Sequence, residues 1–195
     1  MKSMLFHRLA LSTDSAGVLK LAKEGSVINQ AEDLIKDPYV FEFLGIPTQK
    51  KYSENDLEQR LTDNLESFLL ELGKGFTFVG RQYRVTIDNE HYKVDLVFYH
   101  RFLRCFVLID LKIDKIKHHD IGQMNMYLGY FAKEEYFEGD NPPIGIILTR
   151  QKDELLVEFA TYGMSSQLFV SKYQLYLPDE AELRAELEQI LLKHE

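Results

Sequence analysis

Cysteine and tryptophan are almost absent from this chain, since its 195 residues include one Cys and no Trp. A single cysteine excludes an intramolecular disulfide and argues against a cysteine-based zinc site. Cys105 begins an apolar run, and no neighbouring base would activate its thiol. We therefore expect Cys105 to be a small core residue and not a nucleophile.

Long apolar runs are also missing. No stretch approaches the ~20 residues that span a bilayer, and charge interrupts residues 1–8 before a signal-peptide core can form. We expect a cytoplasmic protein with no membrane partner. Because 45% of the residues are hydrophobic, the chain is long enough for one main α/β core.

Positive charge is scarce overall, because 23 Lys and Arg stand against 31 Asp and Glu, a net charge of −8. This balance argues against a protein that coats nucleic acid. Residues 80–119 differ, with eight basic residues against five acids, a net charge of +3. A solvated hairpin and a nucleic-acid contact explain this stretch equally well. From it we take Arg81, Gln82 and Lys115 as predicted nucleic-acid contacts, because a guanidinium such as that of Arg81 suits a phosphate.

The pattern divides the chain into two parts. Residues 1–50 are interrupted by Gly and Pro and predict a small helical or irregular arm, with one helix over Leu9–Lys23 and a second over Ala31–Leu44 that Asp37-Pro38 divides into two short pieces. This arm could be a packing element, a dimer contact or the remnant of an upstream domain. Residues 51–195 predict one α/β domain with a central mixed sheet, an antiparallel hairpin and a crossover.

Hydrophobic spacing gives the expected elements of the second part. They are a helix over Asp56–Leu72, a strand over Phe76–Ile87, a hairpin of strands at 91–99 and 105–112, a helix over Asp120–Lys133, strands over Ile144–Leu148, Leu155–Ala160 and Tyr173–Leu177, and a helix after Pro178.

The predicted hairpin carries the most unusual residues, Asp95, Asp110 and Lys112. Side chains alternate along a strand, so Asp110 and Lys112 share one face. An unpaired charge in an apolar strand costs several kcal/mol, so these residues need compensation. A divalent metal ion would provide it, and so would an Asp110–Lys112 ion pair at a strand end.

One acid on the predicted helix over Asp56–Leu72 is out of place. Measured from Leu57 at ~100° per residue, the apolar positions cover roughly 0° to 120°, and Glu58 falls inside this arc at ~100°. Glu66 at ~180° and Glu71 at ~320° fall outside it. We therefore expect Glu58 to contribute to a site with the strand acids, with Glu71 as the next candidate.

Gln123 and Tyr127 lie four residues apart and share one helix face. Gln123 is either an ordinary surface glutamine or, beside a metal or phosphate site, an amide that orients water. Tyr127 would support it by stacking or by a hydrogen bond, and we count Tyr127 among the predicted nucleic-acid contacts.

These residues resemble the signature of the PD-(D/E)XK nuclease superfamily: an acid on the first helix (Glu58), an acid on the second strand (Asp95), acid-x-Lys on the third (Asp110 and Lys112) and a glutamine on the next helix (Gln123). Residues ~50 to 180 more closely resemble the carboxy-terminal domain of YhcG-like bacterial proteins. The matching runs are Phe68–Gln82, Val94–Tyr99, Ile109–Lys112, Asp120–Gln123 and Ile144–Leu148. The sequence departs from the pattern of this family at two points. Asp110 stands where many relatives have Glu, and no proline precedes the strand acid.

The resemblance implies a restriction-endonuclease-like core and a metal-dependent phosphodiesterase that acts on nucleic acid, with DNA as the expected substrate. Asp95 and Asp110, with Glu58 directly or through water, would hold Mg²⁺ or Mn²⁺. Lys112 would position water or stabilise negative charge, and Gln123 would assist. Two alternatives stay open: a non-catalytic nucleic-acid-binding or assembly module, and a structural dimer domain. A homodimer is compatible with each of them.

Overall fold

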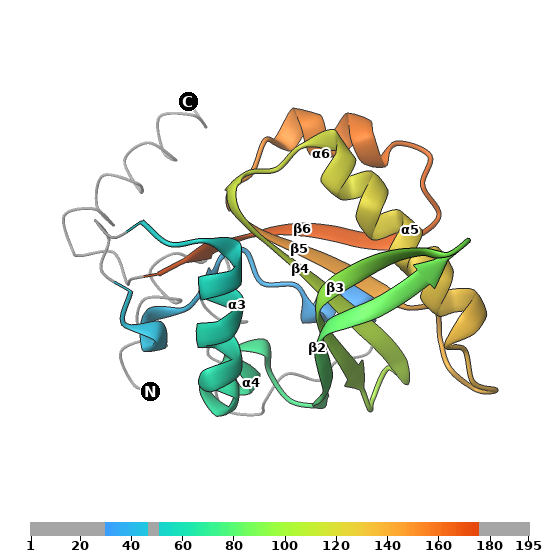
Figure 1. Cartoon of the computed structure of the whole chain (residues 1–195), viewed down its shortest axis with the longest axis horizontal. Helices are drawn as coiled ribbons and strands as arrows, with labels where there is room; N and C mark the ends of the chain where they lie inside the picture. Colours follow the sequence, from blue (N-terminus) through green and yellow to red (C-terminus); the bar gives the residue numbers. More distant parts are fainter. Residues whose placement is uncertain (1–29, 47–50, 176–195) are drawn as a thin grey trace. The chain divides into compact units, whose positions relative to one another are not determined.

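A computed structural model describes residues 30–46 and 51–175, and these build a mixed sheet in the order β1-β6-β5-β4-β3-β2 (Figure 1). The strands are β1 (Tyr39–Val40), β2 (Phe76–Ile87), β3 (Glu90–His100), β4 (Cys105–Lys115), β5 (Ile144–Gln151) and β6 (Gln167–Gln174). The β2/β3 and β3/β4 pairs are antiparallel, and the β4/β5, β5/β6 and β1/β6 pairs are parallel. The predicted mixed sheet with an antiparallel hairpin is therefore confirmed.

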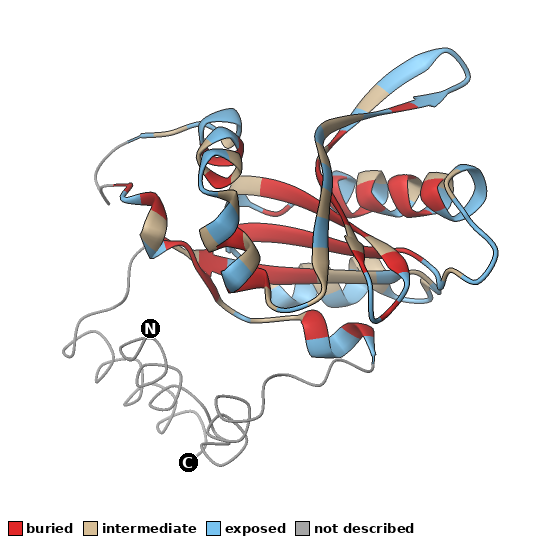
Figure 2. Cartoon of the chain, turned by 90° about the horizontal axis from the view of Figure 1, so that it is seen from below, coloured by how far each residue is buried: buried red, intermediate tan, exposed pale blue. Residues whose placement is uncertain are grey.

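Helices cover both faces of the sheet (Figure 1). The helices are α3 (Glu54–Asp63), α4 (Leu65–Leu72), α5 (His118–Glu134) and α6 (Glu154–Thr161), and the 3₁₀ turns are η1 (Ala31–Leu34) and η2 (Glu42–Leu44). One core cluster joins α3 and α4 to the sheet, and the other joins α5 and α6 to its opposite face. The strands between them are buried on both faces, as Figure 2 shows, which matches the continuous apolar sequence of β5.

The predicted helix over Asp56–Leu72 is two helices that meet at Asn64. This residue has φ −112° and ψ 37°, and its side-chain Nδ2 donates to the Arg60 carbonyl at 2.9 Å. Asparagine commonly offers the backbone such an alternative to helical pairing. The first helix is capped by Ser53, whose hydroxyl accepts from the Asp56 backbone N–H at 3.1 Å. This cap fixes where α3 starts and therefore which way Glu58 faces.

Two predicted strands near the end of the described residues need correction. Leu155–Ala160 is part of α6, because the Asp153 side chain accepts from the Leu156 N–H at 3.2 Å and caps a helix there. A short apolar run does not by itself distinguish strand from helix. The strand predicted at Tyr173–Leu177 is β6, which begins earlier, at Gln167.

Within Ala31–Leu44 the expected break at Asp37-Pro38 is present, but the two short pieces beside it are not α-helical. The segment forms two 3₁₀ turns around β1, with Tyr39 paired to Tyr173 of β6. Pro38 interrupts any continuous helix in this segment. Buried side chains such as Leu34 and Phe41 join the core cluster beneath α3 and α4. The helices expected at 9–23 and after 178 lie outside the described residues, and within 30–46 and 51–175 no helix combines the length and apolarity of a bilayer span.

Candidate active site

The site is built where β3 separates from β4. The two strands pair from His100↔Cys105 to Leu96↔Ile109 and then diverge, since β3 continues with β2 alone. At the divergence the Asp95 Oδ2 atom accepts a hydrogen bond from the Leu111 backbone N–H at 2.8 Å. The carboxylate thus occupies a position that another backbone carbonyl would fill in a regular sheet.

Asp110 and Lys112 lie on the same face of β4, as period-two alternation predicts. The Lys112 Nζ atom is 2.8 Å from Asp110 Oδ2 and 3.9 Å from Glu54 Oε2. The ion pair considered from the sequence is therefore present. It does not lie at a frayed strand end, because the two side chains are only 16% and 6% exposed.

Glu58 reaches the same place from α3 and is buried. The Gln82 amide nitrogen donates to Glu58 Oε2 and, at 3.3 Å, to Asp95 Oδ1, so one side chain bridges the helix acid and the strand acid. Gln82 has φ 46°, which is uncommon for a residue other than glycine and is found at functional sites. Gln82 was predicted as a nucleic-acid contact, but its amide is directed at the two carboxylates.

Arg81 lies at the entrance to this cluster. Its Nε is 3.9 Å from Glu58 Oε1, and its Nη1 donates to the Gln59 side chain. The side chain is 41% exposed, so the guanidinium adds positive charge beside Glu58 while part of it faces solvent. That geometry leaves Arg81 available to an anionic ligand at the edge of the site.

Two of the predicted nucleic-acid contacts are engaged elsewhere in the structure. Tyr127 is fully buried, which conflicts with direct contact to a nucleic acid. Its hydroxyl accepts from the Gln123 amide nitrogen at 2.8 Å and donates to the Lys93 carbonyl at 2.9 Å, so the hydrogen-bond alternative is the one observed. Lys115 is 57% exposed, and its ammonium is 2.8 Å from Asp153 Oδ2 at the start of α6.

Glu71, the second helix acid, is buried away from this cluster. Its Oε1 accepts from the Val40 N–H at 3.2 Å and is 3.8 Å from the Lys36 ammonium. The kink at Asn64 turns α4 so that Glu71 faces β1. Glu71 therefore holds the β1 segment against α4 and does not join the other acids.

The three carboxyl groups are buried, and burial is the largest of the causes that raise the pKa of each. Burial raises the pKa of Asp110 to about 7, the negative charge of Asp95 adds to the rise, and Lys112 opposes it. Burial also raises the pKa of Asp95, against a hydrogen bond from the Leu111 N–H and the charge of Lys112. The pKa of Glu58 is raised by burial despite the Gln82 amide and the Arg81 charge. A bound cation would relieve all three shifts.

The donor set agrees in chemistry with a hard divalent cation. Asp95, Asp110 and Glu58 offer carboxylate oxygens, which Mg²⁺ and Mn²⁺ prefer. In the described part of the chain, Glu58 Oε1 is buried and makes no hydrogen bond. Within the same residues, no three Asp, Glu, His or Cys side chains lie close enough together to enclose an ion. The residue types therefore suit such an ion, and the described side chains do not close around one.

Sequence reasoning missed two acids of the site. Glu54 lies near Lys112, and its charge also raises the pKa of Asp95, after the effect of burial. It precedes Glu58 by four residues, so helical periodicity places both on one face of α3. Asp120 is buried at the start of α5, where its Oδ2 accepts from the Lys117 N–H at 2.8 Å, and after burial and the charge of Asp95 its charge also raises the pKa of Asp110. That spacing is a recognisable capping signal.

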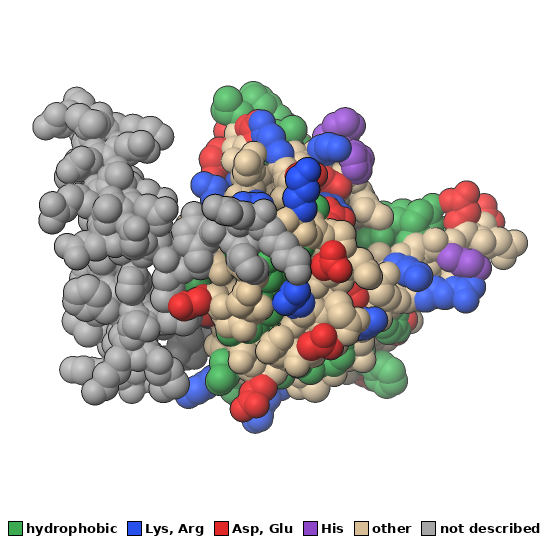
Figure 3. Space-filling view, turned by 60° about the vertical axis from the view of Figure 1, so that its left-hand side comes forward, with side chains coloured by type: hydrophobic (Ala, Val, Ile, Leu, Met, Phe, Trp, Pro, Cys, Tyr) green, Lys and Arg blue, Asp and Glu red, His purple; other side chains and the backbone are tan. Residues whose placement is uncertain are grey.

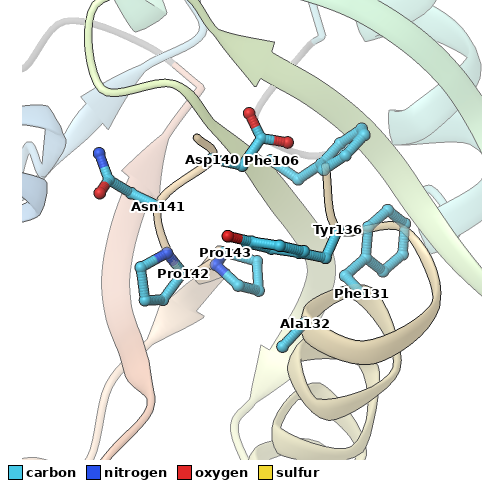
Figure 4. A pocket seen from close by; sticks show the side chains of 8 residues that line it. All are labelled: Phe106, Phe131, Ala132, Tyr136, Asp140, Asn141, Pro142 and Pro143. Atoms are coloured by element: carbon cyan, nitrogen blue, oxygen red, sulfur yellow. The ribbon is translucent and has the colours of Figure 1, made fainter. Parts of the chain in front are cut away.

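A separate pocket lies at the other end of β4 and contains none of these acids (Figure 4). Its lining comes from the start of β4, the last turns of α5 and the loop before β5. The lining residues are Phe106, Phe131, Ala132, Tyr136, Asp140, Asn141, Pro142 and Pro143. Its walls are largely apolar, and they carry one carboxylate. The candidate chemistry therefore resides at the β3/β4 separation and not in this pocket.

Most of the chain is similar to a known protein. The chain is 40% identical over 185 residues to "Putative nuclease YhcG" of Escherichia coli (strain K12), covering 95% of this chain and 49% of that protein. The chain thus spans about half the length of this curated relative.

Two solved structures are partly similar to this chain. A repair endonuclease from Pyrococcus abyssi has 17% identity and a TM-score of 0.43, covering 67% of this chain and 50% of that one. EndoMS in a complex with double-stranded DNA has 15% identity and a TM-score of 0.44, covering 68% and 51%. The model of the family described as the YhcG PDDEXK nuclease domain matches residues 32–188. The chain belongs to this YhcG PDDEXK nuclease domain family.

Proposed function

We propose that this chain is a metal-dependent phosphodiesterase that cleaves nucleic acid, with DNA as its substrate. The observation that carries the proposal is the meeting of Asp95, Asp110 and Lys112 where β3 leaves β4, within reach of Glu58 through Gln82. Membership of a nuclease family whose proteins generally use divalent metal ions supports it.

Asp95 and Asp110 would hold Mg²⁺ or Mn²⁺ directly, and Glu58 would hold one of the ion's waters. The pKa values of all three carboxyl groups are raised chiefly by burial, and a bound cation would favour their charged forms, which supports this assignment. When bound, such an ion polarises the phosphate and makes an attacking water more acidic. The protein keeps the ligands fixed by the Leu111 N–H and the Gln82 amide.

Lys112 would act as a cation and not as a general base. Burial by itself lowers the pKa of Lys112, but the carboxylates of Asp110 and Glu54 outweigh this effect and raise it. The ammonium therefore keeps its proton across the neutral range. Fixed beside the metal ligands, it would stabilise negative charge on the phosphate as the bond breaks.

Gln123 would orient the attacking water. Tyr127 holds the Gln123 amide nitrogen at 2.8 Å, which leaves the amide oxygen as an acceptor. Burial, followed by the charge of Asp110, raises the pKa of Tyr127 to about 12, so its hydroxyl remains a hydrogen-bond donor. Because the charge of Asp110 acts on its pKa, Tyr127 lies close enough to the acids to interact with them electrostatically.

Cleavage assays test this function. The purified protein is incubated with duplex, single-stranded and branched DNA, and with RNA, in Mg²⁺, in Mn²⁺ and in EDTA. We expect metal-dependent cleavage that Asp95→Asn abolishes while far-UV circular dichroism stays unchanged. Binding without cleavage of any substrate would contradict the proposal and favour a non-catalytic module.

A further inference from the structure

Beyond the site, β2 and β3 continue as a two-stranded ribbon, defined here as residues 83–93. Its strands pair through Arg84↔Lys93, Val85↔Tyr92 and Thr86↔His91. Asp88 and Asn89 close it with φ angles of 47° and 64°, as a tight hairpin turn of this kind requires. Figure 2 shows the ribbon projecting past the rest of the sheet, with its tip exposed.

One face of the ribbon is anchored to the protein. Val85 of the ribbon and Val94 just past its end are fully buried in the core cluster of α5. The Tyr83 ring lies 5.4 Å from the Phe131 ring, and its hydroxyl donates to Glu135 at 2.9 Å. The base of the ribbon is therefore fixed by packing, and its direction relative to the site is set by α5.

The opposite face is exposed and basic. Arg84, Thr86, His91 and Lys93 lie on it, and all are exposed. Figure 3 shows basic and histidine side chains along the projecting ribbon, with acids at its end. Arg84 and Lys93 are register partners, and like charges directly opposite each other destabilise a strand pair. Among the ion pairs of the described residues, none neutralises either of the two, so this arrangement favours an anionic ligand.

The Arg84 guanidinium is already held in place on this face. Its Nη2 lies 2.5 Å from His91 Nε2, and His91 Nδ1 lies 3.1 Å from Thr86 Oγ1. A guanidinium only donates, so Nε2 must accept and Nδ1 must carry the ring hydrogen that points to Thr86. One N–H of Arg84 is used in this way, and the others remain available to a phosphate.

The basic face leads directly into the acid cluster. Lys93 precedes Asp95 by two residues on β3, so the two lie on one side of that strand. The charges of Arg81 and Lys93 both act on Glu58, the helix acid of the site. A polyanion that follows these charges from the ribbon therefore reaches the carboxylates and Lys112.

We propose that the ribbon docks in the major groove of duplex DNA, with Arg84 and Lys93 on phosphates, and guides the duplex to the site. This inference rests on the proposed function and specifies its substrate class. A two-stranded ribbon fits the B-form major groove, which is about 12 Å wide, whereas the A-form groove of duplex RNA is too narrow. The acidic tip, Asp88 to Glu90, would face base edges, where carboxylates can accept from cytosine amino groups, away from the phosphates.

Binding measured in EDTA tests the ribbon without requiring cleavage. Fluorescence anisotropy compares wild type, the Arg84→Ala/Lys93→Ala variant and Arg101→Ala on duplex DNA, single-stranded DNA and duplex RNA of one sequence. Arg101 is a matched control, because it is an exposed arginine just past the opposite end of β3. We expect the double variant to bind duplex DNA at least ~10-fold more weakly, with a salt slope reduced by about 1.8, and Arg101→Ala to bind as wild type does.

The outcomes separate this inference from the proposed function. Equal duplex affinity for wild type and the double variant would overturn the ribbon's role, and so would wild-type preference for single-stranded DNA or duplex RNA. An Arg84→Lys/Lys93→Arg variant that retains affinity would support a charge-based contact. If the protein binds duplex DNA through the ribbon but cleaves no substrate, the role of the ribbon is supported and only the proposed phosphodiesterase activity is contradicted.

Discussion

The Asp95 carboxylate accepts a hydrogen bond from the Leu111 backbone N–H at 2.8 Å. This contact lies where β3 and β4 part, so the feature that opens the sheet also fixes one of the acids. Asp110 precedes Leu111 and Lys112 follows it, which places the remaining strand residues of the site beside the same peptide. The separation of β3 from β4 and the grouping of the candidate site residues therefore occur at the same point of the sheet.

Asp110→Asn should change how stability depends on pH. The folded pKa of Asp110 is about 7, against about 4 in an unfolded chain, so the folded state binds the extra proton between these values. The contribution of Asp110 to the free energy of unfolding is therefore fully present below about pH 4 and is lost as the pH rises through about 7. In EDTA, wild type should lose stability from pH 5 to pH 8 through this group and the variant should not. The free energy of unfolding of the variant, relative to that of wild type, should therefore rise by at least about 1 kcal/mol over this range. Urea unfolding at the two pH values measures this, and identical changes in both proteins would refute it.

Divalent metal should stabilise the folded protein. At 100 times the dissociation constant, binding adds ~2.7 kcal/mol, which corresponds to a rise in Tm of roughly 5–10 °C for a chain of this size. Asp95→Asn should remove most of the rise, because it withdraws a charged ligand. Thermal unfolding with Mg²⁺, Mn²⁺ and EDTA measures it. An unchanged rise in the variant would locate the ion elsewhere.

Tyr127→Phe should weaken both the fold and the activity. The variant leaves the Lys93 carbonyl and the Gln123 amide without the partner they share, at a cost of about 1–3 kcal/mol. Cleavage should fall by about 10-fold, because Gln123 loses its orientation. Tyr99→Phe is the matched control, since that hydroxyl donates to Asp140 at 2.7 Å, beside the separate pocket. Equal losses of cleavage in the two variants would count against a role for Gln123.

Strand and helix periodicity were sufficient to group the main acids. Alternation along β4 places Asp110 and Lys112 together, and the angular position of Glu58 on its helix brings it to the same side. Tyr127 was misjudged although it lies three residues after Met124 and four before Phe131 on the apolar stripe of α5, which was a usable signal of burial. These patterns depend only on local geometry, which the sequence encodes directly.

Other features depend on contacts that local patterns do not contain. The positive φ of Gln82 turns its amide toward two acids, and alternation along a strand does not reveal such a change. The pairing of Tyr39 with Tyr173 joins distant parts of the chain through a strand of two residues, too short to show a period. The apolar run at Leu155–Ala160 suits either a helix or a strand, and the cap at Asp153 together with packing on α5 determines the outcome.

Single-turnover cleavage by Lys112→Ala tests the central claim most directly. Lys112 is held 2.8 Å from Asp110, and we assign it to charge that develops during bond breaking. With saturating metal, the variant should cleave DNA at least ~10²-fold more slowly while it keeps the metal-dependent rise in Tm, and Lys133→Ala should cleave as wild type does. Cleavage by Lys112→Ala at the wild-type rate would contradict the assignment of this site as a phosphodiesterase centre.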